Sequence, residues 1–148
     1  MPHRARLLTL LFGLVSATAV AGPSADFIGT GQLAPCPSSP NCVSSQATDD
    51  GHRIASLAIA GDAGAQMAAL VAVVRDLPRT EIKAQTDGYL WVVFTSRLLR
   101  FRDDVEFLLG PGGAVQVRSA SRLGYSDLGV NRARVEMIRA KLTAAVAK

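Results

Sequence analysis

The sequence is poor in the residues from which reactive centres are usually built. Its 148 residues include two cysteines and two histidines, and His52 is the only histidine after residue 21. A serine triad needs a histidine base and a positioned nucleophile, and no nucleophile elbow is present. The chain also has no phosphate-binding loop and no dinucleotide fingerprint, and its cysteines and His52 do not complete a set of zinc ligands. We therefore expect no metal and no cofactor, and the sequence offers little support for an enzyme.

Long apolar runs are also missing, with one exception at the start of the chain. Residues 1–6 are basic, residues 7–15 are apolar, and small residues follow at Ala19 and Ala21. This pattern is typical of a secretory signal peptide, with cleavage expected before Gly22. The alternative is a membrane anchor, but about 15 residues are fewer than the ~20 that a spanning helix needs. We expect residues 1–21 to be removed, export to the periplasm, and no membrane span afterwards.

A strong net charge is missing as well. The whole chain has 16 basic and 12 acidic residues, but Arg4 and Arg6 belong to the expected signal peptide, which leaves 14 basic residues against 12 acidic ones. These charges are dispersed along the chain. Nucleic-acid binding usually requires a basic patch or stripe, so we expect no nucleic-acid partner.

The two cysteines, Cys36 and Cys42, lie close together in the segment CPSSPNC. In an oxidising compartment such a pair usually forms a disulfide. The intervening Pro37, Pro40 and Asn41 favour turns that bring the two ends together. A metal site would lack further ligands, and a redox pair normally has only two intervening residues. We expect a structural disulfide.

Composition and periodicity divide the chain into three parts. Residues 1–21 form the expected signal peptide. Residues 22–51 are rich in Gly, Pro, Ser and Asp and predict an extended N-terminal arm that contains the disulfide loop. Residues 52–148 carry the periodic segments and predict a single α+β domain.

Apolar spacing in this domain predicts two helices. The first follows Asp62, a suitable N-cap, and ends before Pro78. The second has Asn131 as its expected cap. Each helix has one apolar stripe, formed by Met67, Leu70, Val71, Val74 and Leu77 in the first helix and by Val135, Ile138, Leu142 and Val146 in the second.

The segments between the helices predict strands. These strands are expected at residues 81–86, 89–96, 103–109 and 114–121, with the second continuing through 97–101 and a further short strand at 52–59. Short turns such as Asp87-Gly88 favour an antiparallel sheet. The predicted fold is α+β, a two-layer sandwich in which two helices pack on an antiparallel sheet of about four to five strands.

The alternation also predicts the register of the last hairpin. Residues that share a face should lie opposite each other, which places Glu106 opposite Arg118 and Asp104 opposite Ala120. Asp104 is then within reach of Arg118 and Arg122 on the diagonal. One interpretation is a set of ion pairs on a solvated face, each worth ~0–1 kcal/mol. The other is a cleft in which the arginines receive an external carboxylate or phosphate.

The segment GYSDLGVNR predicts a loop that leads into the last helix. Asp127 is placed to accept hydrogen bonds from loop amides, or to pair with Arg122 or Arg132, and a helix N-terminus attracts anions. Two structures fit this pattern: a loop whose polar groups hydrogen-bond to one another, and a ligand-binding site. No residue is assigned a catalytic role, and the candidate ligand-binding residues are Asp104, Glu106, Arg118, Ser119, Ser121, Arg122, Asp127, Asn131 and Arg132.

Three hypotheses about function follow from these residues. The first is a non-enzymatic periplasmic domain that binds a small anionic or amphipathic ligand, or an envelope protein. The second is a hydrolase that uses the carboxylates of Asp104 and Glu106. The third is a structural envelope protein in which the ion pairs only stabilise the hairpin.

Four segments in this order, PCPSSPNCVSSQA, LPRTEI, DDVEF and VRSASRLGYSDLGVNRARVE, resemble DUF1499. This is a family of small bacterial proteins of unknown function with relatives in plant plastids. The resemblance covers roughly Leu33 to Leu142, and the last segment is its most specific part. It implies an exported or envelope-associated setting in bacteria, and it implies no reaction.

Overall fold

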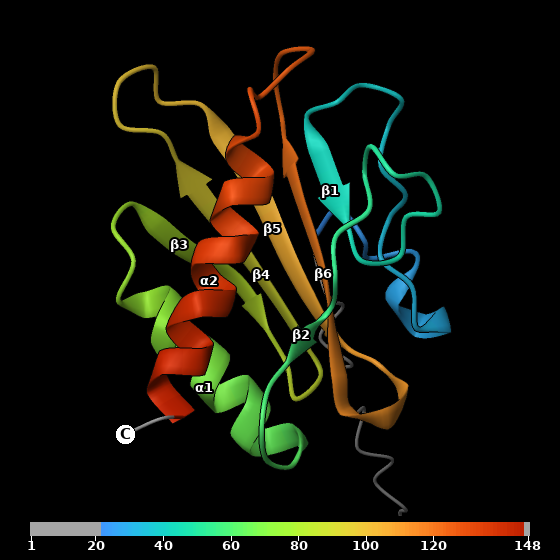
Figure 1. Ribbon diagram of the computed structural model, residues 1–148, viewed down its shortest axis with the longest axis vertical. Helices are drawn as coiled ribbons and strands as arrows, with labels where there is room; N and C mark the ends of the chain where they lie inside the picture. The colour runs from blue at the N-terminus through green and yellow to red at the C-terminus, as the bar shows by residue number, and fades with distance from the viewer. Residues whose placement is uncertain (1–21, 147–148) are drawn as a thin grey trace, which may run out of the picture.

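The protein forms a two-layer α+β fold (Figure 1). The computed structural model describes residues 22–146, so the expected signal peptide lies outside the described residues. The predicted fold class is confirmed, with six strands in the sheet where four to five were expected. In chain order the elements are η1 (Ile28–Thr30), β1 (Cys42–Ser44), β2 (Leu57–Ala58), α1 (Ala63–Arg75), β3 (Thr80–Gln85), β4 (Tyr89–Thr95), β5 (Arg102–Leu109), η2 (Pro111–Gly113), β6 (Ala114–Ser121) and α2 (Val130–Val146).

The sheet is antiparallel, in the order β1-β6-β5-β4-β3. Strands β3 to β6 are neighbours both in the chain and in the sheet, because short connections join them. Both β1 and β2 pair with the outer edge of β6, β1 near its end and β2 near its beginning. The strand expected at residues 52–59 is reduced to the two residues of β2.

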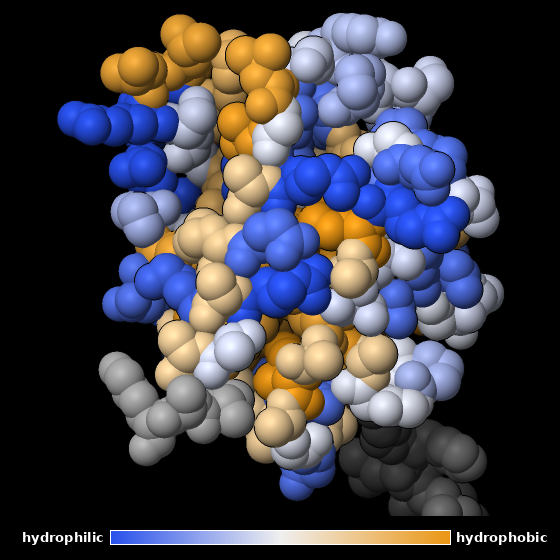
Figure 2. Space-filling model, viewed as in Figure 1, coloured by the Kyte–Doolittle hydropathy of each residue, from blue (hydrophilic) through white to orange (hydrophobic). Residues whose placement is uncertain are grey.

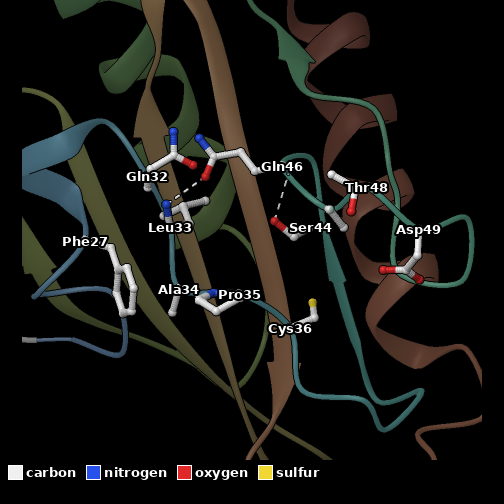
Figure 3. A pocket seen from close by; sticks show the side chains of 11 residues that line it. Phe27, Gln32, Leu33, Ala34, Pro35, Cys36, Ser44, Gln46, Thr48 and Asp49 are labelled. Carbon is white, nitrogen blue, oxygen red and sulfur yellow. Dashed lines mark hydrogen bonds between the residues drawn. The ribbon is translucent and has the colours of Figure 1, made fainter.

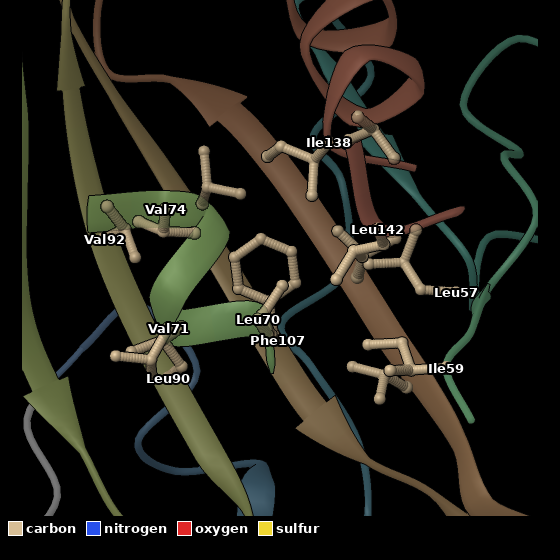
Figure 4. Close-up of a cluster of buried hydrophobic side chains, with 14 of the residues drawn as sticks. Leu57, Ile59, Leu70, Val71, Val74, Leu90, Val92, Phe107, Ile138 and Leu142 are labelled. Atoms are coloured by element: carbon tan, nitrogen blue, oxygen red, sulfur yellow. The ribbon is translucent and has the colours of Figure 1, made fainter. Parts of the chain in front are cut away.

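Both helices pack on one face of the sheet and enclose the main core (Figures 1 and 4). Asp62 caps α1 as predicted, since its side chain accepts a hydrogen bond from the Ala65 amide. The apolar stripes of both helices meet the centre of the sheet, where each fully buried large side chain contributes ~1.5–3 kcal/mol. Completely buried members of this core include Leu70, Val74, Leu90, Phe107 and Ile138.

Residues 22–51 cover part of the opposite face of the sheet. Leu33 packs with Tyr89 and Leu108 in a second, smaller apolar cluster. The predicted disulfide is present and joins Cys36 to Cys42, the first residue of β1. Because the sheet is covered on both faces, β4 is apolar on both of its sides, as its sequence predicts.

The structure corrects the expected length of β4. The strand ends at Thr95, and residues 97–99 form a turn where an extended segment was expected. Hydrogen bonds close this turn, from the Ser96 amide to the Phe101 carbonyl and from the Phe101 amide to the Ser96 hydroxyl. Leu98 and Leu99 are therefore in solvent, 86% and 71% exposed.

Candidate functional site

The predicted register of the last hairpin is confirmed. Glu106 lies opposite Arg118, and Asp104 lies opposite Ala120. These side chains are on the face away from the helices, which we call the covered face because the segment before β1, including Ser24 and Leu33, lies over it. Glu106 is 0% exposed and Arg118 only 8%, so the ion pair is buried where one interpretation expected a solvated face. A buried pair carries a large desolvation cost and needs further hydrogen bonds.

Glu106 receives those hydrogen bonds from separate parts of the fold. Its Oε1 accepts from the Ser24 amide at 2.9 Å and from the Tyr89 hydroxyl at 2.6 Å. Its Oε2 accepts from Arg118 Nη1 at 3.3 Å. Burial and the hydrogen bond to Glu106 both raise the pKa of Tyr89, which keeps the phenol protonated as a donor. Glu106 thus joins the N-terminal segment, β4 and β6 to β5.

Asp104 is paired in a similar way two residues earlier. Arg122 binds both carboxylate oxygens, with Nε 2.9 Å from Oδ2 and Nη2 2.8 Å from Oδ1, and Trp91 Nε1 donates to Oδ1 at 2.8 Å. The hydrogen bond to Asp104 raises the pKa of Arg122. An arginine binds an external anion through the same bidentate geometry. In this protein the guanidinium of Arg122 instead binds the carboxylate of Asp104.

A second polar cluster lies on the helix side of the sheet, around the buried side chain of Asn131. Its Oδ1 accepts from the Ser119 hydroxyl at 2.6 Å and from Arg134 Nη1 at 2.7 Å, and Arg134 also pairs with Asp103 in β5. Asn131 thereby connects α2 to β6 and to the chain before β1. Its hydrogen-bond partners are Asn41, Ser119, Ser121, Asp127 and Arg134.

The structure corrects the expected cap of α2. Asp127 caps this helix in place of Asn131, because its carboxylate accepts from the amides of Gly129 and Asn131 at 3.0 and 2.8 Å. The Asn131 side chain turns inward to the buried cluster instead. Burial alone would raise the pKa of Asp127, but the hydrogen bonds from the two amides outweigh it and lower that pKa.

Arg132 is separate from the other candidate residues. It donates to the carbonyls of Arg53 and Gly51, and Asp127 pairs with neither Arg132 nor Arg122. The sheet divides the rest, because successive strand residues point to opposite faces. Asp104, Glu106, Arg118 and Arg122 lie on the covered face, whereas Ser119, Ser121, Asp127 and Asn131 lie on the helix side.

The candidate residues lie apart from the hollows described on residues 22–146. None of them is among the residues that line these hollows. In that part of the chain, the only buried side-chain polar atoms without a partner are Gln66 Oε1 and Arg118 Nε. A hydrolytic carboxylate must be free to meet substrate and water. The geometry of Asp104 and Glu106 instead favours a structural role.

One hollow opens between the N-terminal segment and the chain after β1 (Figure 3). Its volume is about 370 Å³, with Phe27 and Leu33 among its apolar lining residues and Gln46 among its polar ones. Gln46 is already bonded to the Leu33 amide and the Gly31 carbonyl. This side chain therefore serves to fix the N-terminal segment in place.

A different surface lies where the β4–β5 and β6–α2 loops meet. We call residues 97–101 and 122–130 the loop end; the Arg122 amide bonds to the Arg102 carbonyl and brings the two loops together. Orange areas at the top of Figure 2 lie over these loops. Apart from Phe27 in the N-terminal segment and Met137 within α2, the exposed large apolar side chains of the described residues all lie in the loop end: Leu98, Leu99, Phe101, Leu123, Tyr125, Leu128 and Val130.

Sequence analysis did not identify these apolar residues as a surface. The apolar run of β4 predicts that Leu98 and Leu99 continue that strand, and the polar side chains of the loop before α2 give no indication of an apolar surface. A usable signal was present, because Arg97 and Arg100 flank the two leucines. Arginine is rarely buried, so this pattern fits the centre of a sheet poorly.

No helix within residues 22–146 combines the length and apolar character needed to cross a membrane. Over the same residues, no three His, Cys, Asp or Glu side chains gather as potential metal ligands.

Comparison with known proteins identifies the family. Residues 32–142 match the model of DUF1499, described as a protein of unknown function. The chain belongs to this family. The DUF1499 match includes the disulfide, the side chains of both polar clusters and the loop end, and it confirms the resemblance seen in the sequence. No curated protein matches the chain.

Proposed function

We propose that this DUF1499 protein is an exported, non-enzymatic domain that binds a component of the bacterial envelope through its loop end. The observation that carries the proposal is the gathering of exposed apolar side chains in two adjacent loops. Monomeric proteins rarely expose such residues together unless another surface covers them. Each large apolar side chain that becomes buried in a complex contributes favourable free energy.

Binding is better supported than catalysis by the state of the polar candidates. Asp104 and Glu106 are the carboxylates a hydrolase would use, and each already accepts hydrogen bonds at both oxygens. Arg122 and Arg118 are paired with them. The polar groups therefore serve the fold, and the apolar loops are left for a partner.

Export is supported by the signal-peptide pattern of residues 1–21 and by the disulfide, which persists in oxidising compartments. Gly22, the first residue after the expected cleavage site, packs against Tyr89 and Trp91. Expression of the full chain in bacteria, followed by mass measurement of the periplasmic product, tests this part. We expect a chain that starts at Gly22 and lacks the two cysteine hydrogens. A full-length chain retained in the cytoplasm would contradict export.

The binding role is tested with isolated bacterial envelope fragments, which contain both lipid and protein. The chain from residue 22 onward, which holds every described element, is mixed with the fragments and sedimented. We expect Leu98→Ser with Leu128→Ser to weaken association about tenfold or more, because two apolar contacts are lost. Phe27→Ser is the matched control, since Phe27 is exposed but lies away from the loop end. Equal binding by all three proteins would refute the loop end as the contact surface.

A further inference from the structure

We propose that the envelope component contacted by the loop end is an anionic lipid surface. This inference rests on the proposed function and specifies its partner. Three features of the loop end support it: the projection of its apolar side chains, the backbone conformation that displays them, and the arginines around them.

The most exposed apolar side chains lie on the tips of two neighbouring loops. Leu98, in the turn after β4, is 86% exposed, and Leu128, in the turn before α2, is 94% exposed. Side chains that project in this way can enter the soft boundary between lipid headgroups and acyl chains, which needs no matching pocket. Tyr125 adds an amphipathic ring, which favours the headgroup level, and Phe101 adds a further apolar ring. The projecting shape favours a lipid layer over a rigid protein groove.

The backbone at this end adopts conformations that side chains normally avoid. Among the described residues, the only positive φ angles outside glycine are 58° at Arg79, 57° at Arg100 and 54° at Leu128. Arg100 and Leu128 lie in the loop end, and Arg79 lies beside it, because its carbonyl accepts a hydrogen bond from the amide of Thr95 at the end of β4. The left-handed region is unfavourable for leucine in particular.

Hydrogen bonds around Leu128 maintain this conformation. The Leu128 amide donates to the Ser126 hydroxyl at 3.3 Å, and the Gly129 amide donates to Asp127 Oδ1 at 3.0 Å. Strained residues that surrounding structure holds in place tend to occur at functional positions. A strained leucine with no buried contact surface is consistent with display toward a partner.

The charge of the loop end selects the kind of lipid. Arg97 and Arg100 flank the leucines of the first loop and are exposed, with no hydrogen-bond or ion-pair partner within residues 22–146. Two nearby carboxylates are already paired with other arginines, Asp103 with Arg134 and Asp104 with Arg122. Asp127 keeps its charge, but its carboxylate is held by the amides at the start of α2. Guanidinium groups beside apolar tips match anionic phosphate headgroups.

Sedimentation with synthetic vesicles, which contain no protein, tests the inference. The chain from residue 22 onward is used, so that the apolar run of residues 7–15 cannot contribute. We expect binding to vesicles that contain phosphatidylglycerol, and weak or no binding to vesicles of phosphatidylcholine alone. Added salt should weaken the binding, because it screens exposed charges.

Two sets of variants separate the apolar and the charged contributions. Leu98→Ser with Leu128→Ser should weaken vesicle binding about tenfold or more. Arg97→Gln with Arg100→Gln should weaken binding to anionic vesicles by a similar factor and remove the preference for anionic lipid. Phe27→Ser should bind as the unmodified chain does, and circular dichroism should show that every variant is folded.

The outcomes distinguish this inference from the proposed function. Association with envelope fragments but not with vesicles would overturn the lipid surface and indicate a protein partner, with the proposed function intact. Failure to associate with either material would overturn both. Vesicle binding that the leucine and arginine variants leave unchanged would overturn the loop end as the lipid-binding surface.

Discussion

The covered face of the sheet and the loop end distribute polar and apolar side chains in opposite ways. On the covered face Glu106 and Arg118 are buried, and at the loop end Leu98 and Leu128 are almost fully exposed. Both arrangements are unfavourable by themselves, since buried charges lose hydration and exposed leucines stay in water. On the covered face, hydrogen bonds within the chain offset the lost hydration, such as the one from the Ser24 amide to Glu106. Residues 22–146 provide no contact of this kind to the leucines of the loop end.

This difference separates residues that serve the fold from residues that serve a partner. An unusual side chain that the fold itself satisfies contributes to stability. An unusual side chain left unsatisfied points to a contact outside the chain. Variants of the covered face should therefore lose stability, and variants of the loop end should keep it while they lose binding.

The largest effect is expected for Arg118→Ala on the covered face. This substitution leaves the fully buried Glu106 without its arginine partner, and removal of one member of a buried ion pair costs ~3–5 kcal/mol. Urea unfolding of the two proteins measures the difference in the free energy of unfolding.

The control for this prediction is the double variant Glu106→Gln with Arg118→Met. It removes both charges, while the amide oxygen introduced at position 106 can still accept from Ser24 and Tyr89, so it should recover part of the loss. A cost below ~1 kcal/mol for Arg118→Ala is the value expected of a solvated pair. Such a result would show that this face of the sheet is not covered in solution.

Loss of the disulfide should cause the second largest decrease in the free energy of unfolding. Replacing Cys36 and Cys42 by serine opens a loop whose closure is worth ~2.4 kcal/mol in the chain-entropy model. The bond ties the N-terminal segment to β1, so the loosening should be local. Hydrogen exchange should increase more at the Ser24 amide, which donates to Glu106, than at the Asn131 amide. Equal increases at both amides would show that the two regions are not independent.

The hairpin of the covered face could be predicted because its sequence allows one register. Alternation in DDVEFLL and AVQVRSAS places Val105 and Phe107 on the core face, and a shift by one residue would expose them. The same constraint brings Glu106 opposite Arg118. Helical spacing predicted α1 and α2 for an equivalent reason, since each has a single apolar stripe.

The segments that cover this face could not be predicted in the same way. β1 has only three residues, all buried, so no alternation marks it. The hydrogen bond from Ser24 to Glu106 joins residues 82 positions apart, and local patterns contain no information about such a contact. The prediction of a strand at Leu98 and Leu99 was wrong for another reason. A short apolar run is compatible with a strand or with an exposed turn.

The pH dependence of the α2 cap is expected to be a smaller effect. Amide hydrogen bonds lower the pKa of Asp127 in the folded chain, so its contribution to stability is complete above the unfolded pKa of ~4. That contribution is lost as the pH falls through the folded pKa. Asp127→Ala removes the acceptor of both amides and should cost ~1 kcal/mol at neutral pH, and the difference from the unmodified chain should shrink in acid. A difference that stays constant with pH would show that the carboxylate charge is not what caps the helix.

The smallest stability change is expected at Leu128, and its sign matters more than its size. Asparagine tolerates the left-handed conformation better than leucine, and Leu128 is 94% exposed, so Leu128→Asn should raise the free energy of unfolding by ~0.5–1 kcal/mol. The same variant should bind anionic vesicles less well. Leu98→Asn is the matched control, because Leu98 is exposed without a positive φ, and it should weaken binding with no gain in stability. If Leu128→Asn instead lowered the free energy of unfolding, Leu128 would stabilise its own loop. The loop end would then contribute to the stability of the fold, as the covered face does.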